Sequence, residues 1–292
     1  MGERARIRDF RCSYANSVGV SAEVTEPLGL SFPDAYLHRE TMAQLSRAVK
    51  EHDGAGFCLL PFCRTVEVEA MGGNVNLGNS NTGPRAGEPL CDTVEDLASL
   101  PEIDFSSGRI REVLEACRLL KQQGEVVCLE VTGPWTMAQN LMDSRKVFKY
   151  YRKQPGEMTA ALKGLAARLL PYVENARACG VDIITYSDSA GTLSILGPRL
   201  MDQATREITY DFVKQLDELV DGSMAIQLCP KIAYALIDTG LAEVKMHELG
   251  ERIDFLDALM RLRGTVRLAG QTCIKYTGAT IVNGKIRELV LK

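Results

Sequence analysis

The stretch VVCLEV at residues 126–131 lies between two long segments of helical periodicity, and it decides the fold class. The segment before it, IREVLEACRLLKQ at 110–122, and the segment after it, 156–178, repeat apolar residues at steps of three and four. A strand that is apolar almost throughout is typical of parallel sheets, because helices cover one of its faces and a core fills the other. The stretch therefore predicts a βα unit.

Other segments outward from this unit share its form, a short apolar run followed by a longer helical pattern. A weaker candidate strand is Phe10–Ala15 (FRCSYA), and helical patterns also cover Arg39–Lys50 and Gln203–Leu219. The clearest further strand runs are Gly56–Pro61 (GFCLLP), Val181–Tyr186 (VDIITY), Met224–Cys229 (MAIQLC), Ala242–Met246 (AEVKM) and Val266–Ala269 (VRLA).

Strand-then-helix alternation leaves two main architectures, an eight-fold barrel and an open doubly wound sheet. No G-x-G-x-x-G follows the first clear strand, which weakens the dinucleotide-binding version of the open sheet. A barrel of this kind fits 292 residues as one domain. We predict an α/β protein, a (β/α)8 TIM-type barrel, spanning 1–292 as a single domain with an atypical or incomplete last βα unit.

Three stretches depart from the repeat. Gly72–Pro89 is rich in Gly and Asn and is predicted to be a long loop over the active face. The N-terminal segment, about 1–38, is expected to be irregular, including Asn16–Pro33. At the C-terminus, about 277–292, Asn283-Gly284 separates two strand-like runs and predicts a hairpin.

Composition and charge exclude several classes of function. The chain is 46% hydrophobic and 25% charged, and its 34 Lys and Arg against 38 Asp and Glu are dispersed, so neither a membrane span nor a nucleic-acid partner is expected. The N-terminus MGERARIRDF places charges where a signal peptide needs its apolar run, which predicts a cytoplasmic protein. The nine scattered cysteines are interpreted as reduced thiols, most of them in the core.

Catalytic side chains of such barrels project from the carboxyl ends of strands, and three cysteines stand there. Gln227 and Cys229 are two apart on one strand and share a face, and Cys273 follows a later strand end, as Cys63 follows the first clear one. Two thiolates with an oxygen or nitrogen donor make a plausible zinc site. The alternative is that these are ordinary buried cysteines.

Carboxylates stand at other strand ends. Asp188 closes the run that contains Tyr186, and it either orients a substrate and relays a proton or caps a helix. Glu130 either points into the barrel, where its charge must be paired, or is a surface acid. One of Glu67 and Glu69 lines the site, or both belong to a solvated face, which is the more usual location for such residues. His38, His52 and His247 lack the spacing of a metal pair.

The chain resembles the uroporphyrinogen decarboxylase-like superfamily, and within it the corrinoid-dependent methyltransferase branch, which includes the methylcobamide:coenzyme M methyltransferases. The likeness covers roughly residues 10–275. It rests on these segments, which occur in the family's order: FPDAYLHRETMAQL, TVEVEAMGGNV, TVEDLASLPEID, IREVLEACRLLKQQ, TGPWTMAQNLM, ENARACGVDIITYSDSAG and IQLCPK. The decarboxylases' Arg-rich N-terminal motif has no counterpart here, so the resemblance does not extend to porphyrinogen decarboxylation.

In the branch it resembles, a His-x-Cys pair and a later Cys hold a zinc ion that activates a thiol. Gln227 occupies the first position of that pair and Cys229 the second. A Gln amide oxygen is a weak zinc ligand, so the metal is bound differently, poorly or not at all. No residue of this chain matches the later Cys of the motif, and Cys273 is placed by its strand position alone.

The leading hypothesis is a corrinoid-dependent methyltransferase with zinc at Cys229 and Cys273. It moves a methyl group between a cobalamin on a separate corrinoid-carrying protein and a thiol, ether or amine substrate. The direction of transfer, the choice of methyl donor or of thiol or pterin acceptor, and a homodimer are left open. Asp188, Glu130 and Tyr186 are the catalytic candidates, and Gln227, Glu67 and Asn16 are the substrate-binding candidates.

Two alternatives remain. One is a non-catalytic or regulatory relative that binds a corrinoid or another small ligand, which the Gln at position 227 motivates. The other is a decarboxylase-like lyase that acts on a small acid with Asp188 as the base.

Overall fold

The computed structural model describes residues 8–12, 19–219, 222–276 and 278–292. The chain divides into two compact units, one formed by Tyr14–Asp182 and the other by Met1–Ser13 with Ile183–Lys292. Each unit is described separately. The described residues include no helix that is both long and apolar enough to cross a membrane.

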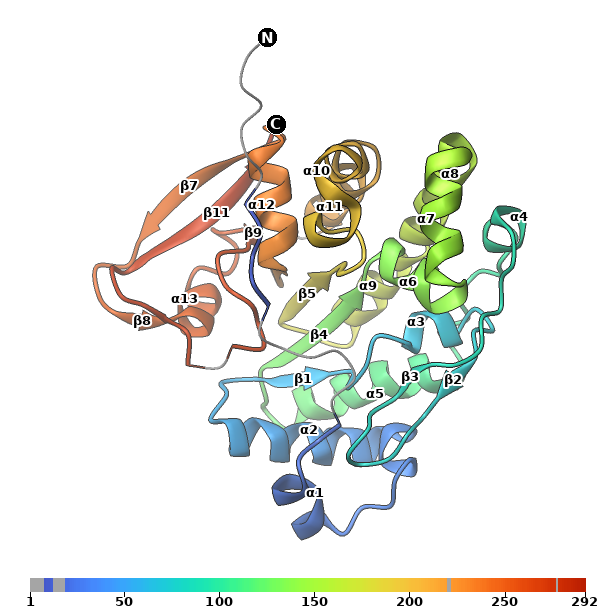
Figure 1. Ribbon diagram of the computed structural model, residues 1–292. Coiled ribbons are helices and arrows are strands. Elements are labelled where there is room, and N and C mark those ends of the chain that lie inside the picture. The colour runs from blue at the N-terminus through green and yellow to red at the C-terminus, as the bar shows by residue number, and fades with distance from the viewer. Residues whose placement is uncertain (1–7, 13–18, 220–221, 277) are drawn as a thin grey trace. The chain divides into compact units, whose positions relative to one another are not determined.

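The unit Tyr14–Asp182 is built on two parallel strands, β1 (Cys58–Leu60) and β4 (Val127–Thr132), paired from Cys58↔Val127 to Leu60↔Leu129. All six residues of β4 are buried, as the run VVCLEV predicts. α2 (Arg39–Asp53) and α5 (Gly108–Gln122) pack side by side, and both contact β1 (Figure 1). The buried face of α5 repeats at helical spacing through Ile110, Val113, Leu114, Cys117 and Leu120.

The predicted helix 156–178 forms as two, α8 (Pro155–Ala167) and α9 (Leu169–Ala178). Pro171 lacks the amide hydrogen that a continuous helix would require near this boundary. Trp135 on α6 and Tyr151 on α7 pack edge to face, 4.7 Å between ring centroids. The other elements are α1 (Ala22–Leu28), η1 (Asp34–Tyr36), α3 (Val66–Glu69), β2 (Val75–Asn76), β3 (Arg85–Ala86), α4 (Val94–Ala98), α6 (Pro134–Leu141) and α7 (Ser144–Lys153).

The second unit begins with another parallel pair, β5 (Ile183–Ser187) and β6 (Ala225–Leu228), and β9 (Leu268–Ala269) adds to β6 in parallel. β5 and β6 are buried throughout. Between them the chain forms α10 (Leu193–Ala204), the π-helical turn η2 (Thr205–Thr209) and α11 (Tyr210–Leu219). The unit also contains α12 (Pro230–Asp238), β7 (Ala242–Glu248), β8 (Ile253–Asp254), α13 (Phe255–Arg261), β10 (Thr280–Ile281) and β11 (Lys285–Leu291).

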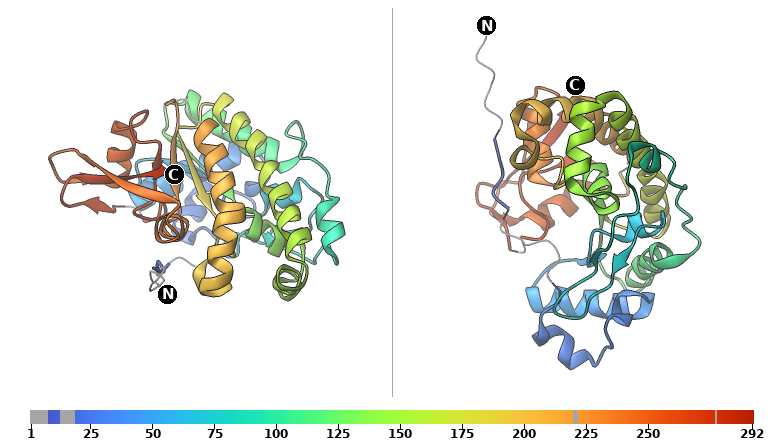
Figure 2. Two further views of the ribbon diagram at one scale, coloured as in Figure 1. Left: turned by 90° about the horizontal axis from the view of Figure 1, so that it is seen from above. Right: turned by 45° about the vertical axis from the view of Figure 1, so that its right-hand side comes forward.

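The last strands depart from the parallel repeat. β7, expected from the run AEVKM as one more strand of the repeat, runs antiparallel to β11 along its whole length, from Ala242↔Leu291 to Glu248↔Lys285 (Figures 1 and 2). β11 also pairs antiparallel with β9 through Glu288↔Ala269. β7 lies at the edge of the sheet and is mostly exposed. After Ala242, only His247 is even half-buried. Among the described residues, the pairings within each unit leave its sheet open.

Three local expectations need correction. Asn283-Gly284 lies in a turn, but β10 pairs with β8 and β11 pairs with β7 and β9, so the strands on either side of that turn do not form the predicted hairpin. The stretch Asn16–Pro33 contains helix α1. Residues 10–12 of the weak strand candidate Phe10–Ala15 form no strand, and residues 13–15 lie outside the described residues. Instead, Arg8 pairs with Asp238 at 2.7 Å, which ties the N-terminal segment to the end of α12.

Candidate functional site

The strand ends of the unit Tyr14–Asp182 carry a cluster of charged side chains. Arg109 on α5 is buried and donates hydrogen bonds to the Sγ of Cys63 at 3.1 Å, to the Oγ1 of Thr65 at 2.9 Å and to the carboxylate of Glu69. Burial opposes the charge of Arg109, but Cys63 and Glu69 outweigh it and hold the guanidinium pKa above its ordinary value. The guanidinium therefore fastens the segment after β1 to α5.

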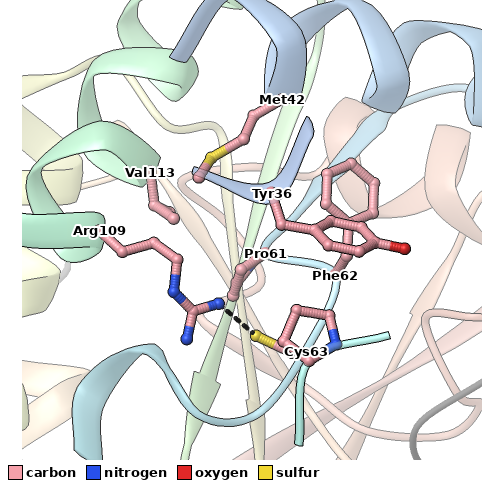
Figure 3. A pocket seen from close by; sticks show the side chains of 8 residues that line it. Tyr36, Met42, Pro61, Phe62, Cys63, Arg109 and Val113 are labelled. Carbon is pink, nitrogen blue, oxygen red and sulfur yellow. Dashed lines mark hydrogen bonds between the residues drawn. The ribbon is translucent and has the colours of Figure 1, made fainter. Parts of the chain in front are cut away.

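A small pocket opens beside this cluster (Figure 3). It has about 180 Å³ of space, part of it open to solvent, and Arg109 points across it toward Cys63. The predicted loop Gly72–Pro89 contributes Pro84 to the lining and contains the two-residue pair of β2 and β3. Burial raises the pKa of the lining residue Tyr36 to about 12, so its hydroxyl stays neutral. The other lining residues are Met42, Pro61, Phe62 and Val113.

Glu67 and Glu130 lie next to that cluster, and both are buried. Glu67 Oε1 accepts the backbone N–H of Thr132 at 2.9 Å, and Glu130 Oε1 accepts from Arg64 Nε at 3.0 Å. Burial raises the pKa of Glu67 to about 7, with a smaller contribution from the charge of Glu130, while the N–H of Thr132 opposes the shift. Neither carboxyl belongs to a solvated face, the alternative considered for each.

The second unit holds the other candidates. Tyr186 and Asp188 at the end of β5 are buried. Burial, assisted by the nearby Asp188, raises the pKa of Tyr186 well above its ordinary value. Asp188 does not cap a helix, because the N-cap of α10 is Thr192, whose hydroxyl bonds to the carbonyl of Ser189 at 2.9 Å. The cap interpretation of Asp188 is therefore wrong.

Gln227 links the two cysteine-bearing segments. Its Oε1 accepts from the hydroxyl of Thr185, and its Nε2 donates to the carbonyls of Leu228 at 2.6 Å and Thr272 at 2.8 Å. Thr272 precedes Cys273, and Cys229 follows β6 directly, so the amide ties the Cys273 loop to the strand that leads to Cys229. Both cysteines are half-buried.

Gly270 allows this loop to lie close to α12. A Cβ at this position would stand 2.5 Å from the Cβ of Ala233 and 3.3 Å from the carbonyl oxygen of Leu228. Only glycine fits that approach without displacing a neighbour. The sequence indicated the strand end here, but it gave no sign that Gln227 and Gly270 would position the loop.

The remaining candidates are placed as follows. Asn16 lies outside the described residues. His247 pairs with Glu288 at 2.6 Å, and His38 and His52 are exposed. The sequence did not single out Arg109, Thr65 or Arg64. An arginine on a helix, such as Arg109, gives no local sign of which strand end it reaches.

The chain belongs to the uroporphyrinogen decarboxylase (URO-D) family, whose model matches residues 16–274. It is 26% identical over 259 residues to the methylcobamide:CoM methyltransferase MtaA of Methanosarcina barkeri, which covers 87% of this chain and 75% of that protein. It is 22% identical over 242 residues to the methylcobamide:CoM methyltransferase MtbA of Methanosarcina mazei, covering 82% of this chain and 70% of the relative. These relatives place the chain among methyltransferases, the class of enzyme predicted from the sequence.

A solved methyltransferase structure from Methanosarcina mazei matches with a TM-score of 0.64 at 23% identity, over 77% of this chain and 68% of that one. The family and this match confirm the TIM-type barrel class of fold. The last βα unit is atypical, because β9 is followed by β10 and β11 and not by a helix.

Proposed function

We propose that this protein transfers a methyl group between a cobamide on a separate corrinoid protein and a heteroatom of a small substrate. The methylcobamide:CoM methyltransferases that it resembles support the methyl-cobamide half of the reaction. The observation that carries the proposal for the site is the Gln227 bridge, which brings the Cys273 loop to the β6 strand end beside Cys229. The proposal covers a thiol, an ether or an amine as the substrate, and both directions of transfer.

Zinc at Cys229 and Cys273 would supply a Lewis acid that activates the heteroatom. The residues do not fit the usual set of three protein ligands. The amide of Gln227 is engaged on both its oxygen and its nitrogen, and the described residues contain no group of three or more His, Cys, Asp or Glu that could hold a metal ion. Zinc binding at Cys229 and Cys273 is therefore a prediction that metal analysis must test.

The buried strand-end residues supply the rest of the proposed chemistry. A thiol must lose its proton before its sulfur can bond to the methyl carbon, and a buried carboxylate such as Asp188 can accept that proton. Tyr186 stays neutral, so its hydroxyl can donate a hydrogen bond to a substrate oxygen or sulfur.

The test begins with metal analysis of anaerobically purified protein, followed by mixing with cob(I)alamin and candidate methyl donors. We expect the methylcobalamin spectrum to appear with at least one donor, or to disappear when methylcobalamin meets a thiol acceptor. Cys229→Ser and Cys273→Ser should each slow the reaction at least tenfold, and Cys12→Ser, at an exposed cysteine, should not. No spectral change with any donor or acceptor would contradict methyl transfer.

The engagement of Gln227 also favours a second candidate, a relative that binds a corrinoid without turnover. In that case the double variant Cys229→Ser/Cys273→Ser should bind methylcobalamin as tightly as the unchanged protein, and neither should consume it. Turnover by the unchanged protein would exclude this candidate.

A further inference from the structure

Glu67 and Glu130 bring two carboxyl groups into the interior of one unit. Glu67 is 0% exposed and Glu130 2%. Glu130 accepts from the cationic Arg64 at 3.0 Å, whereas Oε1 of Glu67 accepts from the neutral backbone N–H of Thr132 at 2.9 Å. Oε2 of Glu67 is buried and has no hydrogen-bond partner among the described residues.

The two arginines near this pair are engaged with groups other than Glu67. Arg109 contacts Glu69, Cys63 and Thr65, and Arg64 contacts Glu130. The helix α6, which also packs on α3, carries no titratable side chain. The titratable groups near Glu67 on the packed elements include Cys63 and Arg64 after β1, Glu69 on α3, Arg109 and Cys117 on α5, Cys128 and Glu130 on β4, and Tyr172 on α9.

Two negative charges on Glu67 and Glu130 would carry a high free-energy cost in this buried environment. A buried carboxylate needs a counter-charge or several hydrogen bonds, and two neighbouring carboxylates raise each other's affinity for protons. Arg64 offers one positive charge, and it is directed at Glu130. Protonation of Glu67 removes the surplus charge and turns Oε2 into a hydroxyl that can donate. In agreement, burial raises the pKa of Glu67 to about 7, and Glu130 contributes to that rise.

We propose that Glu67 and Glu130 share one proton, which resides on Oε2 of Glu67 while Glu130 keeps the negative charge opposite Arg64. This inference concerns the unit Tyr14–Asp182 alone and does not depend on methyl transfer.

The experiment is a titration of the glutamate side-chain carboxyls by carbon-13 NMR, from about pH 5 to about pH 9, on the whole protein without ligand. We expect one carboxyl with a midpoint near neutrality, and Glu67→Gln should abolish that signal. Glu130→Gln removes the repelling charge and should lower the midpoint. Glu157→Gln, at an exposed residue of α8, should leave it unchanged.

Two results would overturn the proposal. One is the absence of a glutamate that titrates near neutrality, and the other is a Glu67 midpoint that Glu130→Gln leaves in place. Circular dichroism checks that each variant is folded. If Glu130→Gln does not fold, Arg64→Met serves instead, and it should raise the midpoint because the pair loses its counter-charge.

Discussion

At the scale of single residues, Gln227 shows how one buried side chain can join three segments of a unit. Its amide spans Thr185 on β5, its own strand end and Thr272. A histidine, as in the motif that this position matches, has two ring nitrogens and cannot reproduce one acceptor and two donors.

We expect Gln227→Ala to lower the free energy of unfolding by about 2–4 kcal/mol, because buried carbonyls lose their donor. Urea denaturation measures this loss. Gln203→Ala is the matched control, since its side chain makes only a hydrogen-bonded contact with Glu207 on the helical surface, and it should cost less than about 1 kcal/mol. Equal costs for the two variants would show that the bridge contributes no stability.

At the scale of elements, the contact between the Cys273 loop and α12 depends on Gly270. We predict that Gly270→Ala lowers the free energy of unfolding by about 1–3 kcal/mol, because the new Cβ would lie 2.5 Å from Ala233. Thermal unfolding measures the change. Gly156→Ala in α8 has open space around its Cβ and should be neutral or stabilising. A stable Gly270→Ala variant would mean that the loop shifts freely.

The sequence predicted the elements well where a strand is buried on both faces. VVCLEV, VDIITY and MAIQLC contain β4, β5 and β6 almost residue for residue, because continuous apolar runs bounded by helical patterns have few other structures available. It failed at the C-terminal strands. A turn at Asn283-Gly284 fixes where the chain reverses but not which strands pair, and the partners of β11 are distant in sequence.

For the candidate site, the sequence predicted the positions of several side chains but not their burial or their partners. Strand-end positions can be read from the sequence, so Glu67, Glu130, Asp188, Gln227 and Cys229 were found as candidates. Burial and partners cannot be read in that way. Whether Glu67 faces solvent or the interior depends on the helix that packs over it, and the sequence favoured solvent for a residue that is fully buried.

At the scale of the whole molecule, the buried carboxyl of Glu67 couples stability to pH. Its pKa is about 7 in the folded protein and about 4.5 when unfolded, so the folded state binds the proton more tightly. The stabilisation is complete below about pH 4.5 and is lost as the pH rises through about 7, a difference of about 3 kcal/mol.

Urea denaturation between about pH 5 and about pH 8 should therefore show a free energy of unfolding that falls with pH, and Glu67→Gln should reduce this slope. Glu157→Gln should reproduce the slope of the unchanged protein. A slope that persists in full in Glu67→Gln would assign the pH dependence to other groups.

The strand order of the second unit has a consequence for biosynthesis. β7 leaves the ribosome well before β11, its long antiparallel partner, and residues 249–284 must be made in between. During that interval the backbone amides and carbonyls of β7 lack the strand that pairs with them in the finished protein. A nascent chain stalled between β7 and β11 would expose an unpaired, partly apolar strand to chaperones and to other nascent chains.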